Sequence, residues 1–282
     1  MLNFIWDNMK FSVLISLYAK EKPEFLKECL KSLKNQTLQA DEILIVFDGK
    51  ITSELEAFVG KYSQELPIKV IRLPENVGLG KALQIGVKKC SHPIIARMDT
   101  DDIATPERFE KQIAFFKTHP EVSVLGSNIS EFNLKPNDLK RRRMLPEKHN
   151  DIYKFAKFRC PMNHPTVVFR KDAVLQAGNY SDELLLWEDY TLWITMLLKG
   201  YIFHNLQEDL LYFRVKDGKE TIKRRSGWKY AKDELKLAKY MKKNGFLSWQ
   251  EYLKFIVIRP LGRLLPTSIL LHAYNKFYRK TK

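Results

Sequence analysis

Short apolar runs alternate with amphipathic stretches through the first half of the chain. The apolar runs have the length of strands and lie at residues 11–19, 42–49, 68–74, 93–99 and 122–127. The stretches between them repeat apolar residues three and four positions apart, as helices do, at residues 23–36, 53–65, 78–90 and 106–119. Strands that are apolar throughout and alternate with helices indicate a largely parallel sheet covered on both faces.

The second half of the chain is less regular. A polar, basic connection at residues 135–151 precedes a predicted strand and short helix within residues 160–180. A helix within residues 184–200 and a strand at residues 210–215 follow. From residue 226 onward we expect two or three helices, which would form an extension of the α/β domain.

Polar side chains follow three of the predicted strands. Tyr18 and Asp48 end the first and second strands, and Asp99, Asp101 and Asp102 follow the fourth. In open α/β sheets, ligands bind beyond the carboxyl ends of the strands. The pattern therefore predicts one ligand site at this edge of the sheet.

The acidic group after the fourth strand suits a divalent cation. Asp-x-Asp presents two carboxylates to one hard ion, and Mg²⁺ or Mn²⁺ held in this way can stabilise a departing diphosphate. The alternative is that these acids only solvate a turn before a helix that starts with Thr105 as N-cap and Pro106 as its first residue. The sheet-edge position favours the metal and nucleotide interpretation.

The net charge of the chain, +15, is concentrated at its C-terminal end. Residues 216–282 contain 18 basic and 5 acidic residues, which leaves the rest of the chain nearly neutral. Such a segment indicates an anionic partner, either lipid headgroups, nucleic acid or an acidic polymer. Residues 251–280 combine apolar and cationic positions without the length of a membrane span, which is typical of helices lying on a membrane surface. A helical pair packed on the catalytic domain is the alternative.

The cysteines and the N-terminus predict a cytoplasmic location. Cys29, Cys90 and Cys160 are odd in number and widely spaced, which indicates free thiols in a reducing compartment. Asp7 interrupts the short apolar stretch before Lys10, so no signal peptide is expected.

Five segments resemble the family 2 glycosyltransferases, which have the GT-A fold. They occur in the family's order and spacing: FSVLISLYAKEKPEFLKECLKSLKNQT, EILIVFDG, ENVGLGKAL, ARMDTDDIATPERFEKQ and WEDYTLW. The aspartate pattern and the C-terminal RRSGWKYAKDE…VIRPLGRLLP resemble the amylovoran and O-antigen biosynthesis branch. The resemblance implies a catalytic domain at residues 10–215, with a nucleotide-binding half at about 10–127 and an acceptor half at about 128–215. Residues 216–282 would form a basic amphipathic helical tail.

The resemblance also implies roles for individual residues. The nucleotide-sugar would contact Tyr18, Glu21, Asp48, Asn76, Lys81, Asp99 and Asp102, with Asp48 at the uracil edge. Asp99 and Asp101 would bind the metal ion. Two departures from the family pattern lie in this half: Ser16 and Ala19 replace the usual Pro and Asn, and VFDG replaces the commoner VDDG.

Gly78 and Gly80 lack the spacing of a phosphate-binding P-loop, and their chemistry favours a tight helix entry instead.

In the acceptor half, the resemblance makes Asp189 the general base, with Glu188 beside it. A base there could take the proton of an acceptor hydroxyl that attacks opposite the leaving UDP, so one displacement would convert an α-linked donor into a β-glycoside. The alternative is that both acids only favour a helix N-terminus. Other acceptor or diphosphate candidates are His164, Trp187, Arg214 and Arg225; the run at residues 140–143 is interpreted as a solvated face.

These observations predict an inverting, metal-dependent hexosyltransferase in cell-surface polysaccharide biosynthesis. Its donor would be UDP-galactose or UDP-glucose, its acceptor a sugar on a polyprenyl diphosphate carrier, and its location the inner face of the cell membrane, bound peripherally. One alternative is a nucleic-acid-binding protein that uses the basic tail, but this leaves the acidic group unexplained and the tail lacks a known recognition motif. A sugar nucleotidyltransferase would need a Gly-rich loop where the chain reads YAKEKPE.

Overall fold

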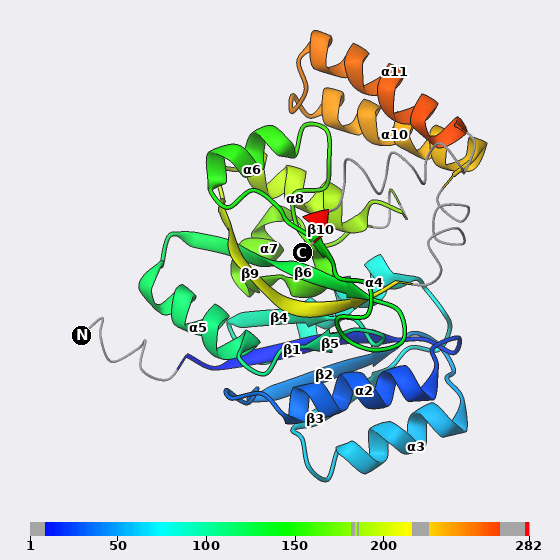
Figure 1. The fold of residues 1–282 in the computed structure, drawn as a ribbon, viewed down its shortest axis with the longest axis vertical. Helices are drawn as coiled ribbons and strands as arrows, with labels where there is room; N and C mark the ends of the chain where they lie inside the picture. Colours follow the sequence, from blue (N-terminus) through cyan, green and yellow to red (C-terminus); the bar gives the residue numbers. More distant parts are fainter. Residues whose placement is uncertain (1–8, 182–183, 185, 216–225, 266–279, 282) are drawn as a thin grey trace.

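A mixed ten-stranded sheet forms the centre of the computed structural model (Figure 1), which describes residues 9–181, 184, 186–215, 226–265 and 280–281. Four parallel strands make one half, in the order β3-β2-β1-β4. Their bounds are β1 Phe11–Leu17, β2 Glu42–Phe47, β3 Ile68–Arg72 and β4 Ile94–Met98. The α/β architecture predicted from the alternating pattern is confirmed.

The other half of the sheet is mixed in direction. β8 (Val168–Arg170) lies antiparallel to both β4 and β6 (Val122–Phe132), and β9 (Ile202–Arg214) runs parallel to β6. Short strands complete the sheet: β5 (Ile103–Ala104) pairs with β9, while β7 (Arg141–Arg143) lies between β6 and β10 (Lys280–Thr281).

Alternating side chains of the central strands enter two separate cores. Val13 and Ile15 of β1 pack with one core, and Leu14 between them packs with the other. The first core is covered by α2 (Pro23–Lys34), α3 (Ser53–Tyr62) and α5 (Arg108–Thr118). The second lies under α4 (Leu79–Lys89), α6 (His149–Phe155), α7 (Lys171–Ala177) and α8 (Glu188–Leu198). Both faces of the sheet are therefore buried, as uninterrupted apolar strands require.

Several sequence-based boundaries were wrong. The helix expected from Pro106 begins at Arg108, and Thr105 is not its N-cap, because its hydroxyl and amide both donate to Leu210 O on β9. The polar connection at residues 135–151 contains β7 and the start of α6. The strand expected at residues 210–215 is the end of the 13-residue β9. In each case pairing with a distant strand or helix overrode the local pattern.

The C-terminal extension begins as a helical hairpin, α10 (Trp228–Lys243) and α11 (Trp249–Leu264). Ser248 caps α11 in a capping box with Glu251, which sets the turn between the two helices. Leu237, Met241 and Phe255 join the core under α8, and Figure 1 shows the hairpin at the opposite end of the molecule from α3. None of the described helices is long and apolar enough to cross a membrane.

Candidate active site

The carboxyl ends of β1, β2 and β4 lie at one edge of the sheet because these strands are parallel neighbours. Tyr18, which follows β1, is 42% exposed there. Glu21 binds the aspartate segment directly, since its carboxylate accepts a hydrogen bond from the Thr100 hydroxyl. The loop after β1 and the loop after β4 are therefore joined, as the sequence predicted for a shared site.

Asp99, Asp101 and Asp102 converge after β4. Each offers a carboxylate oxygen, and these oxygens lie within 4.8 Å of one another. Burial and, after it, the nearby carboxylates of Asp99 and Glu21 together raise the pKa of Asp101 to about 7. Three acids held this close are electrostatically unfavourable without a cation.

Asp102 is the deepest of the three, with no exposed surface. Burial, and then the charge of Asp101, raise its pKa well above the usual range. Its Oδ1 accepts a hydrogen bond from the Arg214 amide at 2.8 Å, whereas Oδ2 is buried with no hydrogen-bond partner among the described residues. An all-oxygen donor set with an unsatisfied buried oxygen fits a hard divalent cation such as Mg²⁺ or Mn²⁺.

Arg97 on β4 is a site residue that the sequence analysis missed. Its guanidinium is 2% exposed and lies 2.5 Å from Asp99 Oδ1, while its Nε and Nη1 have no hydrogen-bond partner within the described part of the chain. Its charge also lowers the pKa of Asp101, Glu188 and Asp189. Arg97 thus lies between the aspartates and the α8 acids. The signal was a charged residue inside an otherwise apolar strand.

Asp48 holds the loop before α4. Its carboxylate accepts hydrogen bonds from Asn76 Nδ2 at 3.0 Å, Val77 N at 2.7 Å and Gly78 N at 3.1 Å. The side chain is 4% exposed, so its oxygens are occupied by the chain itself. These hydrogen bonds shape the loop that carries Asn76. A carboxylate can accept about four hydrogen bonds, so a bond from Asp48 to a uracil edge stays a prediction.

Gly78 and Gly80 act at the start of α4, as the sequence predicted. Gly78 is the N-cap with φ of +87°, a conformation that favours glycine. A Cβ on Gly80 would lie 2.9 Å from Glu188 Cβ, so glycine allows α4 to approach α8 closely. Lys81 follows on α4 and is half-buried.

Glu188 and Asp189 form the first turn of α8, after Trp187 as N-cap. Burial and, after it, the charge of Asp189 together raise the pKa of Glu188 to about 7. Burial also raises the pKa of Asp189, whose Oδ2 lies 3.5 Å from the Cys160 thiol and whose Oδ1 accepts from Tyr190 N. Two adjacent acids of raised pKa can accept or hold a proton near neutral pH.

Glu188 keeps one oxygen available. Its Oε2 is buried with no hydrogen-bond partner among the residues that the structure describes, and Asp99 is among the charges that raise its pKa. The aspartate group and the α8 acids therefore form one electrostatically connected site.

His164 lies beside this site. Its Nε2 is 2.9 Å from the Tyr180 hydroxyl, and its ring packs edge-on against Trp193. Burial, with the nearby charge of Arg97, lowers the His164 pKa well below the usual range. The imidazole is therefore neutral at pH 7, which suits hydrogen bonding rather than binding of an anion.

The structure gives Arg214 a structural role. It donates from Nε to Asp101 O and from Nη1 to Asn133 O, and its Nη2 pairs with the Glu28 carboxylate. These contacts use three of the five N–H groups of a guanidinium, so Arg214 anchors the aspartate segment, and its contact with a diphosphate stays a prediction. Arg225, the other arginine predicted for the diphosphate, lies outside the described residues.

The interpretation of residues 140–143 as a solvated face was wrong. Arg141, Arg142 and Arg143 form the half-buried strand β7. Arg142 binds the Asp209 carboxylate with two nitrogens, at 2.5 and 2.8 Å, and Arg143 lies 3.3 Å from the buried Glu131. The run is basic because the strands beside it carry acids.

The predicted thiols are confirmed, since Cys29, Cys90 and Cys160 are all free.

Comparisons with known proteins agree with this geometry. The family model described as glycosyl transferase family 2 matches residues 12–176. The chain is 44% identical to the amylovoran biosynthesis glycosyltransferase AmsE of Erwinia amylovora, over 94% of this chain and 98% of the relative. It is 39% identical to the UDP-Gal:alpha-D-GlcNAc-diphosphoundecaprenol beta-1,3-galactosyltransferase of Escherichia coli, over 97% of this chain and 98% of the relative.

The fold has solved counterparts as well. The crystal structure of S. aureus TarS 1–349 in complex with UDP-GlcNAc superposes with a TM-score of 0.66 at 20% identity, covering 90% of this chain and 72% of that one. This likeness supports the GT-A fold expected from the sequence motifs. The family match and the two relatives show that the chain belongs to glycosyl transferase family 2, in the branch of the amylovoran and O-antigen enzymes.

Proposed function

We propose that this glycosyltransferase moves a hexose from a UDP-sugar to a sugar carried on a polyprenyl diphosphate, with inversion at the anomeric carbon. One observation carries the proposal: the group Asp99, Asp101 and Asp102 is linked through Arg97 to Glu188 and Asp189. A transferase that separates a sugar from UDP needs positive charge at the diphosphate and a base at the acceptor. The aspartates can hold a cation that supplies the positive charge, and the acids of α8 can supply the base.

The aspartates would hold a divalent cation, with Asp99 and Asp101 as ligands. When bound, such an ion neutralises the negative charge that develops on the departing diphosphate. Glu21 and Asp102 fix the segment on which these ligands lie, through Thr100 and the Arg214 amide. Tyr18 and the loop of Asn76 and Lys81 would line the nucleoside side of the site.

Asp189 would act as the general base. The acceptor oxygen attacks the anomeric carbon as its proton passes to the Asp189 carboxylate, and the bond from that carbon to the UDP oxygen breaks with its electron pair going to UDP. Attack opposite the leaving group converts an α-linked donor into a β-glycoside. Glu188 and the neutral His164 would orient the acceptor beside Trp187.

The substrate classes follow from the relatives. AmsE is named for amylovoran biosynthesis, and the Escherichia coli relative is named for UDP-Gal and an acceptor on diphosphoundecaprenol. Both match this chain over nearly its whole length, which supports a UDP-sugar donor and a lipid-linked sugar acceptor in cell-surface polysaccharide biosynthesis. UDP-galactose is the donor in the name of the Escherichia coli relative, and UDP-glucose is the second donor that we propose. Such an acceptor would place the protein on the cytoplasmic face of the membrane, bound peripherally.

A donor screen tests this function. Purified protein would be incubated with Mn²⁺ or Mg²⁺, a panel of nucleotide sugars and a short-chain sugar diphospholipid, followed by NMR of the product. We expect one UDP-hexose to be consumed and a β-linked product to form. Transfer of an α-linked sugar, or no transfer from any UDP-sugar, would contradict the proposal.

A further inference from the structure

The C-terminal hairpin carries most of the exposed large apolar side chains of the described chain. Six such residues are found in residues 9–215, whereas the much shorter segment 226–265 has nine: Trp228, Leu235, Trp249, Leu253, Val257, Ile258, Leu261, Leu264 and Leu265. Single exposed hydrophobic residues need no explanation, but a concentrated group marks an interaction surface.

α11 places four of these residues in one stripe. Trp249, Leu253, Val257 and Leu261 follow one another at intervals of four residues, which places them on one face of the helix. Each is more than half exposed, at 67%, 55%, 54% and 57%. The opposite face packs inward through Phe255, which has no exposed surface. α11 therefore has two apolar faces. One packs against the protein, and the other is exposed to solvent.

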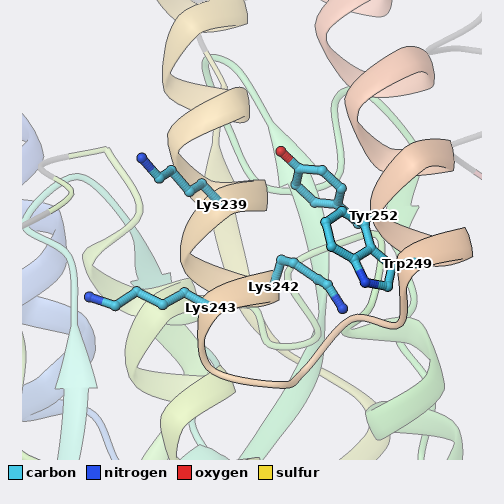
Figure 2. Close-up of a pocket in the computed structure, with 5 residues that line it drawn as sticks. All are labelled: Lys239, Lys242, Lys243, Trp249 and Tyr252. Atoms are coloured by element: carbon cyan, nitrogen blue, oxygen red, sulfur yellow. The ribbon is translucent and has the colours of Figure 1, made fainter.

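Lysines of α10 adjoin this stripe. Lys239, Lys242 and Lys243 of α10 line a hollow of about 300 Å³ together with Trp249 and Tyr252 of α11. In Figure 2 the Lys242 side chain extends toward Trp249, whereas Lys239 and Lys243 extend from the other side of α10. The Lys242 ammonium lies 4.5 Å from the centre of the Trp249 ring. Residues 228–264 contain nine basic and three acidic residues, a net charge of +6. The apolar stripe thus begins at a cationic cluster.

We infer that the outer face of α11 and the lysines of α10 form the surface by which this protein docks on an anionic lipid bilayer. The apolar stripe fits the acyl region, the lysines fit anionic headgroups, and Trp249 lies between them, as tryptophan does at membrane interfaces. A nucleic acid would satisfy the lysines but leave the stripe in water. The inference rests on the proposed function for its setting, because the acceptor there is lipid-linked.

The inner face of α11 connects this surface to the catalytic helix. Arg259 donates to Phe158 O at 2.8 Å, and its guanidinium lies 5.5 Å from the ring centre of Trp187, the N-cap of α8. A helix with its side chains is about 10 Å thick. A bilayer against the outer face would therefore lie close to the α8 acids, where a short headgroup on a lipid carrier can reach them.

Vesicle sedimentation of the full chain tests the surface. Wild-type protein would be pelleted with phosphatidylcholine vesicles that contain or lack 30% phosphatidylglycerol, at low and high salt. We expect binding to the anionic vesicles that weakens with salt. The double variant Leu253→Asp/Leu261→Asp should bind the anionic vesicles at least tenfold more weakly. The double variant Lys239→Glu/Lys243→Glu should lose most of the salt-sensitive binding, with the vesicle affinity falling about fivefold or more for each lysine replaced.

Matched controls use exposed residues far from the hairpin. Leu134→Asp, at a side chain that is 81% exposed, and Lys88→Glu/Lys89→Glu on α4 should bind vesicles like the wild type. Circular dichroism would check that each variant folds. The surface is refuted by a wild type that does not bind vesicles, or by hairpin variants that bind vesicles as tightly as the wild type. Hairpin variants that lose dimerisation or oligonucleotide binding, and not vesicle binding, would also refute the docking surface.

Two acceptors separate this inference from the proposed function. With a water-soluble acceptor analogue the hairpin variants should keep the wild-type rate, whereas with lipid-linked acceptor in vesicles they should be slowed at least tenfold. Vesicle binding by a wild type that transfers no sugar would overturn the function and leave the surface in place. Sugar transfer by a wild type that does not bind vesicles would overturn the docking surface and leave the proposed function in place.

Discussion

Two groups of buried charge in this protein are built in opposite ways. At the sheet edge, three carboxylates share the charge of one buried arginine, Arg97. In the hairpin, the single carboxylate of Glu234 has no exposed surface and binds both Arg259 and Arg263, at 2.8 and 2.7 Å. The hairpin group has enough positive charge within the chain, and the edge group does not.

This difference separates structural from functional charge. A buried acid that its own chain neutralises holds elements together, here α10 to α11. A group of acids whose charge the chain neutralises only in part is electrostatically unfavourable by itself. Such a group is typical of functional sites, where a bound cation or a transferred proton supplies the missing positive charge. Removing an acid should therefore reduce activity at the sheet edge and stability in the hairpin.

The largest effect is expected from Asp101→Asn. The change removes a proposed metal ligand while relieving repulsion from Asp99, so transfer should fall by about a thousandfold or more with no loss of folding stability. Calorimetry should show that Mn²⁺ no longer strengthens UDP binding. The control Asp151→Asn changes an exposed acid of α6 and should behave as wild type. Normal activity of the Asp101 variant, or of wild type in EDTA, would exclude the metal role.

Asp189→Asn should separate chemistry from donor binding. Without a base at α8, we expect kcat to fall by about a hundred- to a thousandfold, since general-base contributions have this size. The affinity for UDP and metal should stay close to that of wild type, because the aspartates are unchanged. A variant that keeps its rate would remove Asp189 as the base, and Glu188→Gln would then be the variant to examine.

Glu234→Gln tests the neutralised group. The amide keeps the shape of the side chain but removes the negative charge that Arg259 and Arg263 share. Both arginines are partly exposed, so water lessens the energetic cost of this loss. We expect the free energy of unfolding to fall by about 2 kcal/mol, measured in urea. Metal-dependent UDP binding should be unaltered, and Glu54→Gln at an exposed position of α3 is the matched control. An unchanged unfolding midpoint would contradict a structural role.

The smallest effect concerns pH. Because burial raises the pKa of Glu188 to about 7 beside Asp189, the pair takes up a proton as pH falls through neutrality, and a protonated pair cannot serve as base. The rate should therefore drop below pH 7 and level off above it. Glu188→Gln removes the like charge next to Asp189, so the midpoint of the profile should move to lower pH. A midpoint that does not move would show that the pair does not control the rate.

Sequence motifs located the site but not the partners of its residues. The acids Asp99, Asp101, Glu188 and Asp189 were found because motifs and strand ends point to them. Arg97 was missed, since periodicity treats a residue inside an apolar strand as core. The sequence assigned Arg214 to a diphosphate but does not show that its guanidinium also binds Asp101 O, Asn133 O and Glu28.

The amino-acid sequence by itself determined the α/β class, the central strands and the edge where the acids gather, because local periodicity and strand direction decide these features. Only the tertiary structure decided which charges are neutralised. Arg141–Arg143 became a strand beside Glu131 and Asp209, and Asp48 became the support of the loop that carries Asn76. Whether a charge is compensated depends on residues far away in the chain, and no local pattern contains that information.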